Sequence, residues 1–176
     1  MQTRLASLAA TVLLGASLFS LPAFAAGDGG DSQTVECKTG EVYDKVQKKC
    51  VPAEQGRLDD DSIYETGRDL AMKGRYDEAI NILTLASDKT DSRILNYLGY
   101  AHRKSGRVLV GLGYYEEALR NDPDYTLVRE YMGEAHLQLG NLAAAREQLG
   151  EIEKRRGKDC AEYAELSAQI EAYLKG

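Results

Sequence analysis

The stretch that decides the fold is residues 92–125, which read SRILNYLGYAHRKSGRVLVGLGYYEEALRNDPDY. The same plan returns in the flanking segments 60–91 and 126–159. Glycine stands at the eighth and fifteenth places of each segment, and Ala or Gly stands at the twentieth. These residues are Gly67, Gly99 and Gly133, then Gly74, Gly106 and Gly140, then Ala79, Gly111 and Ala145. A period of 34 residues, two shorter in the first copy, indicates a repeat array.

Each copy contains two stretches in which apolar residues recur at helical spacing, as in Ala79, Ile80 and Leu83. Small residues at the eighth and twentieth places let two antiparallel helices approach closely. Glycine at the fifteenth place can adopt the left-handed conformation that ends a helix. We therefore predict helices at about residues 60–73, 76–87, 91–105, 107–120, 124–139 and 141–155.

Two features of this helix prediction remain open in the sequence. Gly111 and Gly113 each weaken the fourth helix by about 1 kcal/mol, and either tight packing or a local kink would explain them. Asp159 is predicted to cap a seventh helix at about 160–174, with Leu166 and Ile170 on one apolar stripe. A terminal helix of this kind covers the edge that the last repeat would otherwise expose.

The middle copy resembles the tetratricopeptide repeat, a helix-turn-helix unit of this length. The residues that match the family pattern are Leu95, Leu98, Gly99, Gly106, Tyr115, Ala118 and Pro123. Gly111 and His102 depart from it, and the third copy has Gly157 in place of the terminal proline. The resemblance covers about residues 60–174. It implies an all-α solenoid of three repeats (60–91, 92–125 and 126–159), followed by a capping helix and C-terminus (160–176), and a binding scaffold.

Composition excludes some classes of function. The chain of 176 residues has 22 Lys and Arg against 28 Asp and Glu, a net charge of −6. Neutralising phosphates requires an excess of basic residues, so no nucleic-acid partner is expected. Hydrophobic residues make up 43%, which is ordinary for a globular domain and argues against wholesale disorder.

The first 25 residues have the three parts of a secretory signal peptide. Arg4 supplies the positive start, an apolar run follows, and Ala23 and Ala25 stand at the small-x-small exit. We predict residues 1–25 as a signal peptide cleaved after Ala25, and a periplasmic or secreted location. No membrane span would then remain in the mature chain. A retained anchor is the alternative, but the run of about 17 residues is at the lower limit for a span.

A small cysteine-bounded segment follows a Gly- and Asp-rich stretch, 26–36, that is predicted to be disordered. Cys37 and Cys50 are expected to form a disulfide in an oxidising compartment, closing a hairpin segment at 37–51. A two-cysteine zinc site is the rival interpretation. The polar stretch 52–59 is predicted to be a linker. Lys45, Lys48 and Lys49 are interpreted as a solvated face rather than a binding patch.

Few residues suggest chemistry. His102 and His136 lie one repeat apart, and packing at the eleventh place is favoured over a metal pair because no third ligand falls nearby in the spacing. Cys160 is the odd thiol, expected to be buried under the seventh helix, with an intermolecular disulfide as the alternative. No nucleophile elbow, phosphate loop or zinc motif is present. The sequence therefore predicts neither an enzyme nor a cofactor.

The family resemblance also implies a binding surface. In tetratricopeptide-repeat proteins, places two, five, nine, twelve and thirteen of each first helix point into a concave groove. The candidates for partner binding are Tyr64, Arg68, Arg93, Asn96, Tyr100, Arg103, Lys104, Glu130 and Glu134. The middle of this set is basic and aromatic, and its far end is acidic. The carboxylate-clamp subgroup has Lys and Asn where this chain has Tyr64 and Arg68, so that activity is not inferred. Charges that only solvate a curved surface are the alternative.

These observations together predict a non-enzymatic periplasmic adaptor that binds a protein or peptide partner in the cell envelope. The alternative is a structural or self-assembling envelope protein. Oligomeric state in solution separates the two.

Overall fold

The computed structural model describes residues 35–53 and 58–176. The predicted signal peptide, nearly all of segment 26–36 and part of the predicted linker 52–59 lie outside these ranges. Within them the elements are β1 (Glu41–Asp44), β2 (Lys49–Pro52), α1 (Asp60–Met72), α2 (Tyr76–Leu83), α3 (Ser92–Lys104), α4 (Val108–Asn121), α5 (Thr126–Gln138), α6 (Leu142–Arg156) and α7 (Ala161–Lys175).

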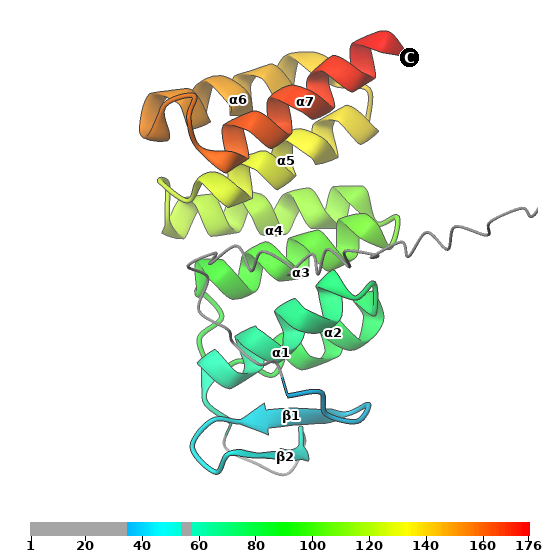
Figure 1. Cartoon of the computed structure of the whole chain (residues 1–176), viewed down its shortest axis with the longest axis vertical. Helices are drawn as coiled ribbons and strands as arrows, with labels where there is room; N and C mark the ends of the chain where they lie inside the picture. Colours follow the sequence, from blue (N-terminus) through cyan, green and yellow to red (C-terminus); the bar gives the residue numbers. More distant parts are fainter. Residues whose placement is uncertain (1–34, 54–57) are drawn as a thin grey trace, which may run out of the picture. The chain divides into compact units, whose positions relative to one another are not determined.

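The helices form pairs that follow one another in chain order (Figure 1): α1 with α2, α3 with α4, and α5 with α6. The three-repeat all-α prediction is confirmed. Each pair is joined by a turn whose glycine has positive φ, with +77° at Gly74, +88° at Gly106 and +75° at Gly140. A side chain would be strained in that conformation, so the glycines at the fifteenth place fix where each first helix ends.

The glycines at the eighth place are sites of close helix approach, as predicted. A Cβ atom at Gly99 would lie 2.5 Å from Tyr115 of α4. A Cβ atom at Gly67 would clash in the same way with Leu83 of α2. Both contacts are too close for real atoms, so glycine sets the spacing of these helix pairs.

The two glycines inside α4 have different explanations. A Cβ atom at Gly111 would lie 2.7 Å from the carbonyl oxygen of Gly99, so tight packing accounts for this residue. A Cβ atom at Gly113 would have nothing within 4 Å. The helix runs unbroken from Val108 to Asn121, so neither glycine interrupts it.

Two predicted helix ends are wrong. We expected the second helix to reach residue 87, but α2 ends at Leu83. The carboxylate of Asp60 accepts hydrogen bonds from the backbone N–H groups of Ser87 and Asp88, at 2.7 and 2.8 Å, which holds these residues outside the helix. At the other helix, Cys160 rather than Asp159 is the N-cap residue of α7, and it makes no capping hydrogen bond through its side chain.

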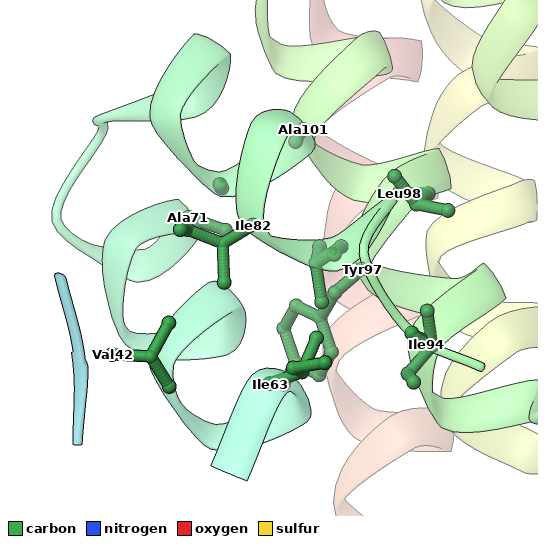
Figure 2. Packing of buried hydrophobic residues seen from close by; sticks show 11 residues of the cluster. Val42, Ile63, Ala71, Ile82, Ile94, Tyr97, Leu98 and Ala101 are labelled. Atoms are coloured by element: carbon green, nitrogen blue, oxygen red, sulfur yellow. The ribbon is translucent and has the colours of Figure 1, made fainter. Parts of the chain in front are cut away.

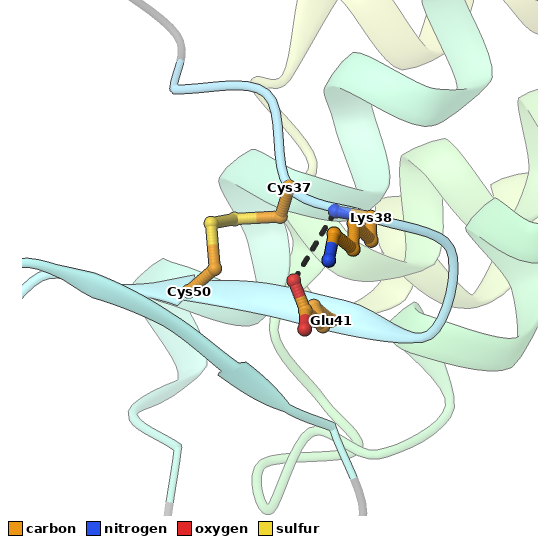
Figure 3. The surroundings of a disulfide bond; sticks show 4 residues. All are labelled: Cys37, Lys38, Glu41 and Cys50. Atoms are coloured by element: carbon orange, nitrogen blue, oxygen red, sulfur yellow. Dashed lines mark hydrogen bonds between the residues drawn. A yellow bond between two sulfur atoms is a disulfide. The ribbon is translucent and has the colours of Figure 1, made fainter.

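The cysteine-bounded segment is a two-stranded antiparallel hairpin that packs on the first repeat. Its strands pair with Tyr43 opposite Cys50, and Cys37 and Cys50 form the predicted disulfide (Figure 3). Val42 of β1 is fully buried in the apolar cluster of the first repeat, together with Ile63 and other residues (Figure 2). The hairpin therefore covers the open edge of α1, which the sequence did not indicate.

Helix α7 covers the opposite end of the repeats, as predicted. It packs on α5 and α6, with Leu166 fully buried and Ile170 nearly so. A Cβ atom at Gly133 would lie 2.6 Å from Leu166. In the third copy, the space beside the glycine at the eighth place is therefore occupied by a side chain of α7. Across the described ranges, no helix is both long enough and apolar enough to cross a membrane.

Candidate functional site

The predicted partner-binding residues lie on the first helices of the three repeats, which are α1, α3 and α5. Residues four apart lie on one face of a helix, so places five, nine and thirteen form a grid across three neighbouring helices. We call this grid the first-helix face. Its members are Tyr64, Arg68 and Met72 on α1, Asn96, Tyr100 and Lys104 on α3, and Glu130, Glu134 and Gln138 on α5.

Exposure of the first-helix face rises along the helices. At place five, Asn96 is fully buried and Glu130 is 8% exposed. At place nine, Tyr100 and Glu134 are half-buried. At place thirteen every member is exposed, and Met72 reaches 54%. A partner can therefore contact this face mainly at places nine and thirteen, toward the C-terminal ends of α1, α3 and α5.

Arg93, at place two of the second copy, is held by carboxylates of the same chain. Its guanidinium lies 2.7 Å from Asp91 and 2.9 Å from Asp61. Hydrogen bonding to Asp91 raises the pKa of Arg93 and lowers the pKa of Asp91. The same cation lies 4.8 Å from the ring centroid of Tyr64. Arg93 thus ties α1 to α3 and is already neutralised.

Arg103, in the second repeat, is a buried cation whose side chain is 1% exposed. Its Nη1 atom lies 2.8 Å from the carboxylate of Glu134, and its Nε atom donates to the hydroxyl of Tyr115 at 3.3 Å. The guanidinium also lies 5.5 Å from the ring centroid of Tyr100 and 5.7 Å from that of Tyr131. Arg103 is therefore a packing residue that joins the second repeat to the third.

Among the titratable groups of the first-helix face, Glu130 has the largest shift in pKa. Burial, together with the nearby carboxylates of Glu134, Glu162 and Glu165, raises the pKa of Glu130 to about 8, and the positive charge of Arg103 acts in the opposite direction. The acidic end of the predicted surface therefore lies against α7, and Glu134 is already paired. This end offers less free negative charge than the sequence suggested.

Tyrosine rings form a connected cluster that includes two members of the first-helix face, Tyr64 and Tyr100. Tyr100 is at its centre, with ring centroids 5.0 Å from Tyr131, 6.1 Å from Tyr97 and 6.4 Å from Tyr76. Tyr97 also lies 5.8 Å from Tyr64. Sequence reasoning did not single out Tyr97 or Tyr131. Both stand at the sixth place of their copies, and that recurrence was the available signal.

Arg68 and Lys104 are the exposed cations of the first-helix face. The Nε atom of Arg68 donates to the Tyr97 hydroxyl at 3.2 Å, and Lys104 Nζ lies 5.9 Å from the ring centroid of Tyr100. Among the described residues, neither cation forms an ion pair. They differ in this respect from Arg93 and Arg103.

The histidines and Cys160 take packing positions. His102 stacks on Tyr114 with ring centroids 5.3 Å apart, and Arg107 Nε donates to His102 Nδ1 at 2.9 Å. Partial burial lowers the pKa of both His102 and His136. Cys160 has a free thiol and is half-buried rather than fully buried. Within the described part of the chain, no three His, Cys, Asp or Glu side chains gather as a metal site.

Comparison with known proteins agrees with this architecture. Two family models described as tetratricopeptide repeat match, one over residues 64–126 and the other over residues 103–170. No curated protein matches the chain in sequence.

Several solved structures share the fold. The first such domain of human RPAP3 has a TM-score of 0.59 and 19% identity, covering 66% of this chain and 92% of that one. The Yersinia enterocolitica type III secretion chaperone SycD, in complex with a peptide of the translocator YopD, has a TM-score of 0.55 and 23% identity, covering 65% and 88%. PcrH, in complex with the chaperone-binding region of PopB, has a TM-score of 0.55 and 26% identity, covering 65% and 94%.

Proposed function

Since residues 64–170 of this chain are tetratricopeptide repeats, we propose that the protein is a non-enzymatic scaffold that binds a protein or peptide partner across its first-helix face. The proposal rests on the exposed part of that face, where Arg68 and Lys104 form no ion pair among the described residues. Arg68, Met72 and Lys104 are exposed there beside the half-buried ring of Tyr100. Arg and Tyr are the side chains that most often anchor protein interfaces.

The related structures support a peptide-binding role. SycD was solved with a peptide of the translocator YopD, and PcrH with the chaperone-binding region of PopB. The first repeat domain of Spaghetti (RPAP3) was solved with an HSP90 peptide. This chain has the same repeat architecture, closed at its two ends by the hairpin and by α7. Capping elements cover the apolar ends of a repeat array, and it is the extended concave surface of such arrays that is used for binding.

The partner belongs, in this proposal, to the cell envelope. The leader-like pattern of residues 1–25 and the disulfide between Cys37 and Cys50 support a location outside the cytoplasm, because disulfides persist in oxidising compartments. N-terminal sequencing of the protein from the native cell tests this. We expect a chain that starts at Ala26, and an intact Met1 in a membrane fraction would refute the location.

Affinity capture from an extract of the native cell tests the scaffold role. The variant Met72→Lys with Gln138→Lys changes two exposed residues at place thirteen, so we expect it to keep the fold. The variant Asn81→Lys with Ala143→Lys adds the same charge on exposed residues of α2 and α6. We expect the first variant to lose the captured partner and the second to keep it. Equal capture by both would refute the first-helix face as the site.

Self-association is a second candidate function, and a specific observation on α4 favours it. Leu109 is 72% exposed and Val110 is 47% exposed, next to the open surface at Gly113. The first copy carries Asp77 and Glu78 at the two equivalent places. Light scattering of the purified protein tests this candidate. An oligomer that Leu109→Asp converts to a monomer would support it, and a monomer of the wild type would refute it.

A further inference from the structure

The outward side of α4 carries an apolar side chain that the described part of the chain leaves exposed. Among the large apolar side chains on the described helices, Leu109 is the most exposed, at 72%, and its neighbour Val110 is 47% exposed. Leu109 and Gly113 are each two residues from Gly111, which packs closely against α3. Two residues correspond to a turn of about 200° around a helix, so the side of α4 that carries Leu109 and Gly113 faces away from α3.

Gly113 is a glycine that the packing of the described chain does not require. It lies inside α4, its φ is not positive, and a Cβ atom there would have nothing within 4 Å. Glycine makes a helix interior less stable than alanine does, and at Gly99 and Gly111 a closely packed helix explains it. An open glycine alone does not define a site, since Gly150 of α6 is open too. The residue one turn before Gly150 is the charged Arg146, whereas the residue one turn before Gly113 is an exposed leucine.

The combination of an exposed leucine and an open glycine is confined to the second repeat. The residues at the two corresponding places are Asp77 and Asn81 in the first copy and Ala143 and Glu147 in the third. Polar and small residues are usual on a helix surface in contact with water. The second copy therefore differs from both neighbours at two places that lie one turn apart on the same side of a helix.

Leu109 and Gly113 are complementary to the same two residues of a second copy when the two α4 helices run antiparallel. With the two-fold axis at the level of residue 111, Leu109 of each copy lies opposite the partner's Gly113. In a parallel arrangement leucine would meet leucine and glycine would face glycine across a gap. The exposed carboxylate of Glu116, on the same side of α4, would then lie beside that of the other copy. The antiparallel arrangement separates these two carboxylates by about 15 Å along the axis, and it is the one that a closed two-fold dimer provides.

On this basis we infer that two copies of this chain associate through α4 in an antiparallel two-fold dimer, in which Leu109 of each copy packs on the partner's Gly113. The inference rests on self-association, the second candidate function, and adds the residues that meet and their register. The first-helix face belongs to α1, α3 and α5, so this dimer leaves both copies of that face accessible. Two linked binding faces would hold a repeated or oligomeric partner more tightly than one face does.

Sedimentation velocity of the full mature chain, from about 10 to about 300 μM, tests the inference, because a contact between two short helix segments predicts weak association. Leu109→Ala removes the leucine and Gly113→Leu fills the place that receives it. We expect each to raise the dimer dissociation constant at least about tenfold, since every change occurs twice in a symmetric dimer. A surface that is merely apolar would respond to Gly113→Leu with tighter association. Gln169→Leu adds the same side chain at an exposed residue of α7 and is expected to leave the dimer unchanged.

Two compensation experiments test the register. The double variant Leu109→Ala with Gly113→Leu exchanges the two positions and is expected to regain the dimer that each single change weakens. An equimolar mixture of the two single variants is expected to form a heterodimer, because one copy then supplies both leucines and the other supplies both open places. Circular dichroism of each variant confirms that the helices remain folded, which we expect because residues 109 and 113 are exposed.

The outcomes separate this inference from the functions on which it builds. A wild type that stays monomeric throughout this range would refute self-association and the inference together. If that monomer also loses a captured protein on Gly113→Leu, another protein rather than a second copy occupies this side of α4. A dimer that Leu109→Asp abolishes but Gly113→Leu strengthens, or a mixture of single variants that stays monomeric, would leave self-association standing and refute the register. The scaffold role is tested apart from all of these, by capture through the first-helix face.

Discussion

The sharpest test of the packing account is one substitution made at two glycines of the same helix. Gly111→Ala and Gly113→Ala both replace a glycine inside α4, so both gain about 1 kcal/mol of helix propensity. They differ in surroundings. A new Cβ at residue 111 would lie 2.7 Å from the Gly99 carbonyl oxygen and 3.1 Å from the backbone nitrogen of Arg103, whereas a new Cβ at residue 113 would meet nothing within 4 Å.

The expected effects on stability therefore have opposite signs. Backbone atoms cannot rotate away, so Gly111→Ala forces α3 and α4 apart at an overpacking cost of about 2–3 kcal/mol, which exceeds the propensity gain of about 1 kcal/mol. We expect Gly111→Ala to lower the free energy of unfolding by roughly 1–2 kcal/mol and Gly113→Ala to raise it by about 0.5–1 kcal/mol. Urea denaturation followed by circular dichroism measures both. A stabilised Gly111→Ala protein would refute the close approach of α3 and α4.

Three further predictions concern buried charge, protonation and the disulfide. Arg103→Ala leaves the carboxylate of Glu134 and the Tyr115 hydroxyl without their partner, so we expect a loss of about 3–5 kcal/mol in urea denaturation; a loss below 1 kcal/mol would contradict the burial of this pair. Because the pKa of Glu130 is raised to about 8 from 4.5, the folded state binds this proton more tightly than the unfolded state, and the contribution of Glu130 to stability falls as pH rises from 4.5 to about 8. Glu130→Gln should therefore be more stable than the wild type near pH 8, with the difference shrinking toward pH 5, and a constant difference would contradict the assignment. Mass mapping without reduction should find Cys37 linked to Cys50 with Cys160 free, and Cys37→Ser with Cys50→Ser should lower stability by about 3 kcal/mol in the chain-entropy model while the helices remain folded.

The sequence predicted the repeats well because local chemistry determines them. Some positions require glycine, either because the backbone has positive φ, as at Gly74, or because another helix lies close, as at Gly99. These glycines recur at fixed places in the sequence, so the repeat can be recognised without knowledge of the tertiary structure. The end of α2, which was predicted wrongly, depends on a long-range contact. The carboxylate of Asp60, which lies on α1, accepts hydrogen bonds from the backbone of Ser87 and Asp88. The local sequence of α2 does not indicate that contact.

The surface was less predictable than the fold. Place in a repeat indicated which side chains share a face, but not which of them are already paired. Arg103 looks as available as Arg68 in the sequence, yet its carboxylate partner, Glu134, lies in the next repeat. Arg93 is held by the neighbouring Asp91 and also by Asp61, which lies on another helix. The packing of Val42 on the first repeat was also invisible, because a buried valine in a short hairpin has the same sequence pattern as one in an independent module.

The central claim is that the first-helix face holds a partner, and site-specific photocrosslinking in the native cell tests it most directly. A photoreactive amino acid placed at residue 72 on α1 would report contacts of the exposed end of that face. The same group at residue 146 on α6 serves as the control, since Arg146 is exposed on a second helix of the array. We predict a crosslinked partner from residue 72 and none from residue 146. A partner that crosslinks only from residue 146, or equally from both, would contradict the account.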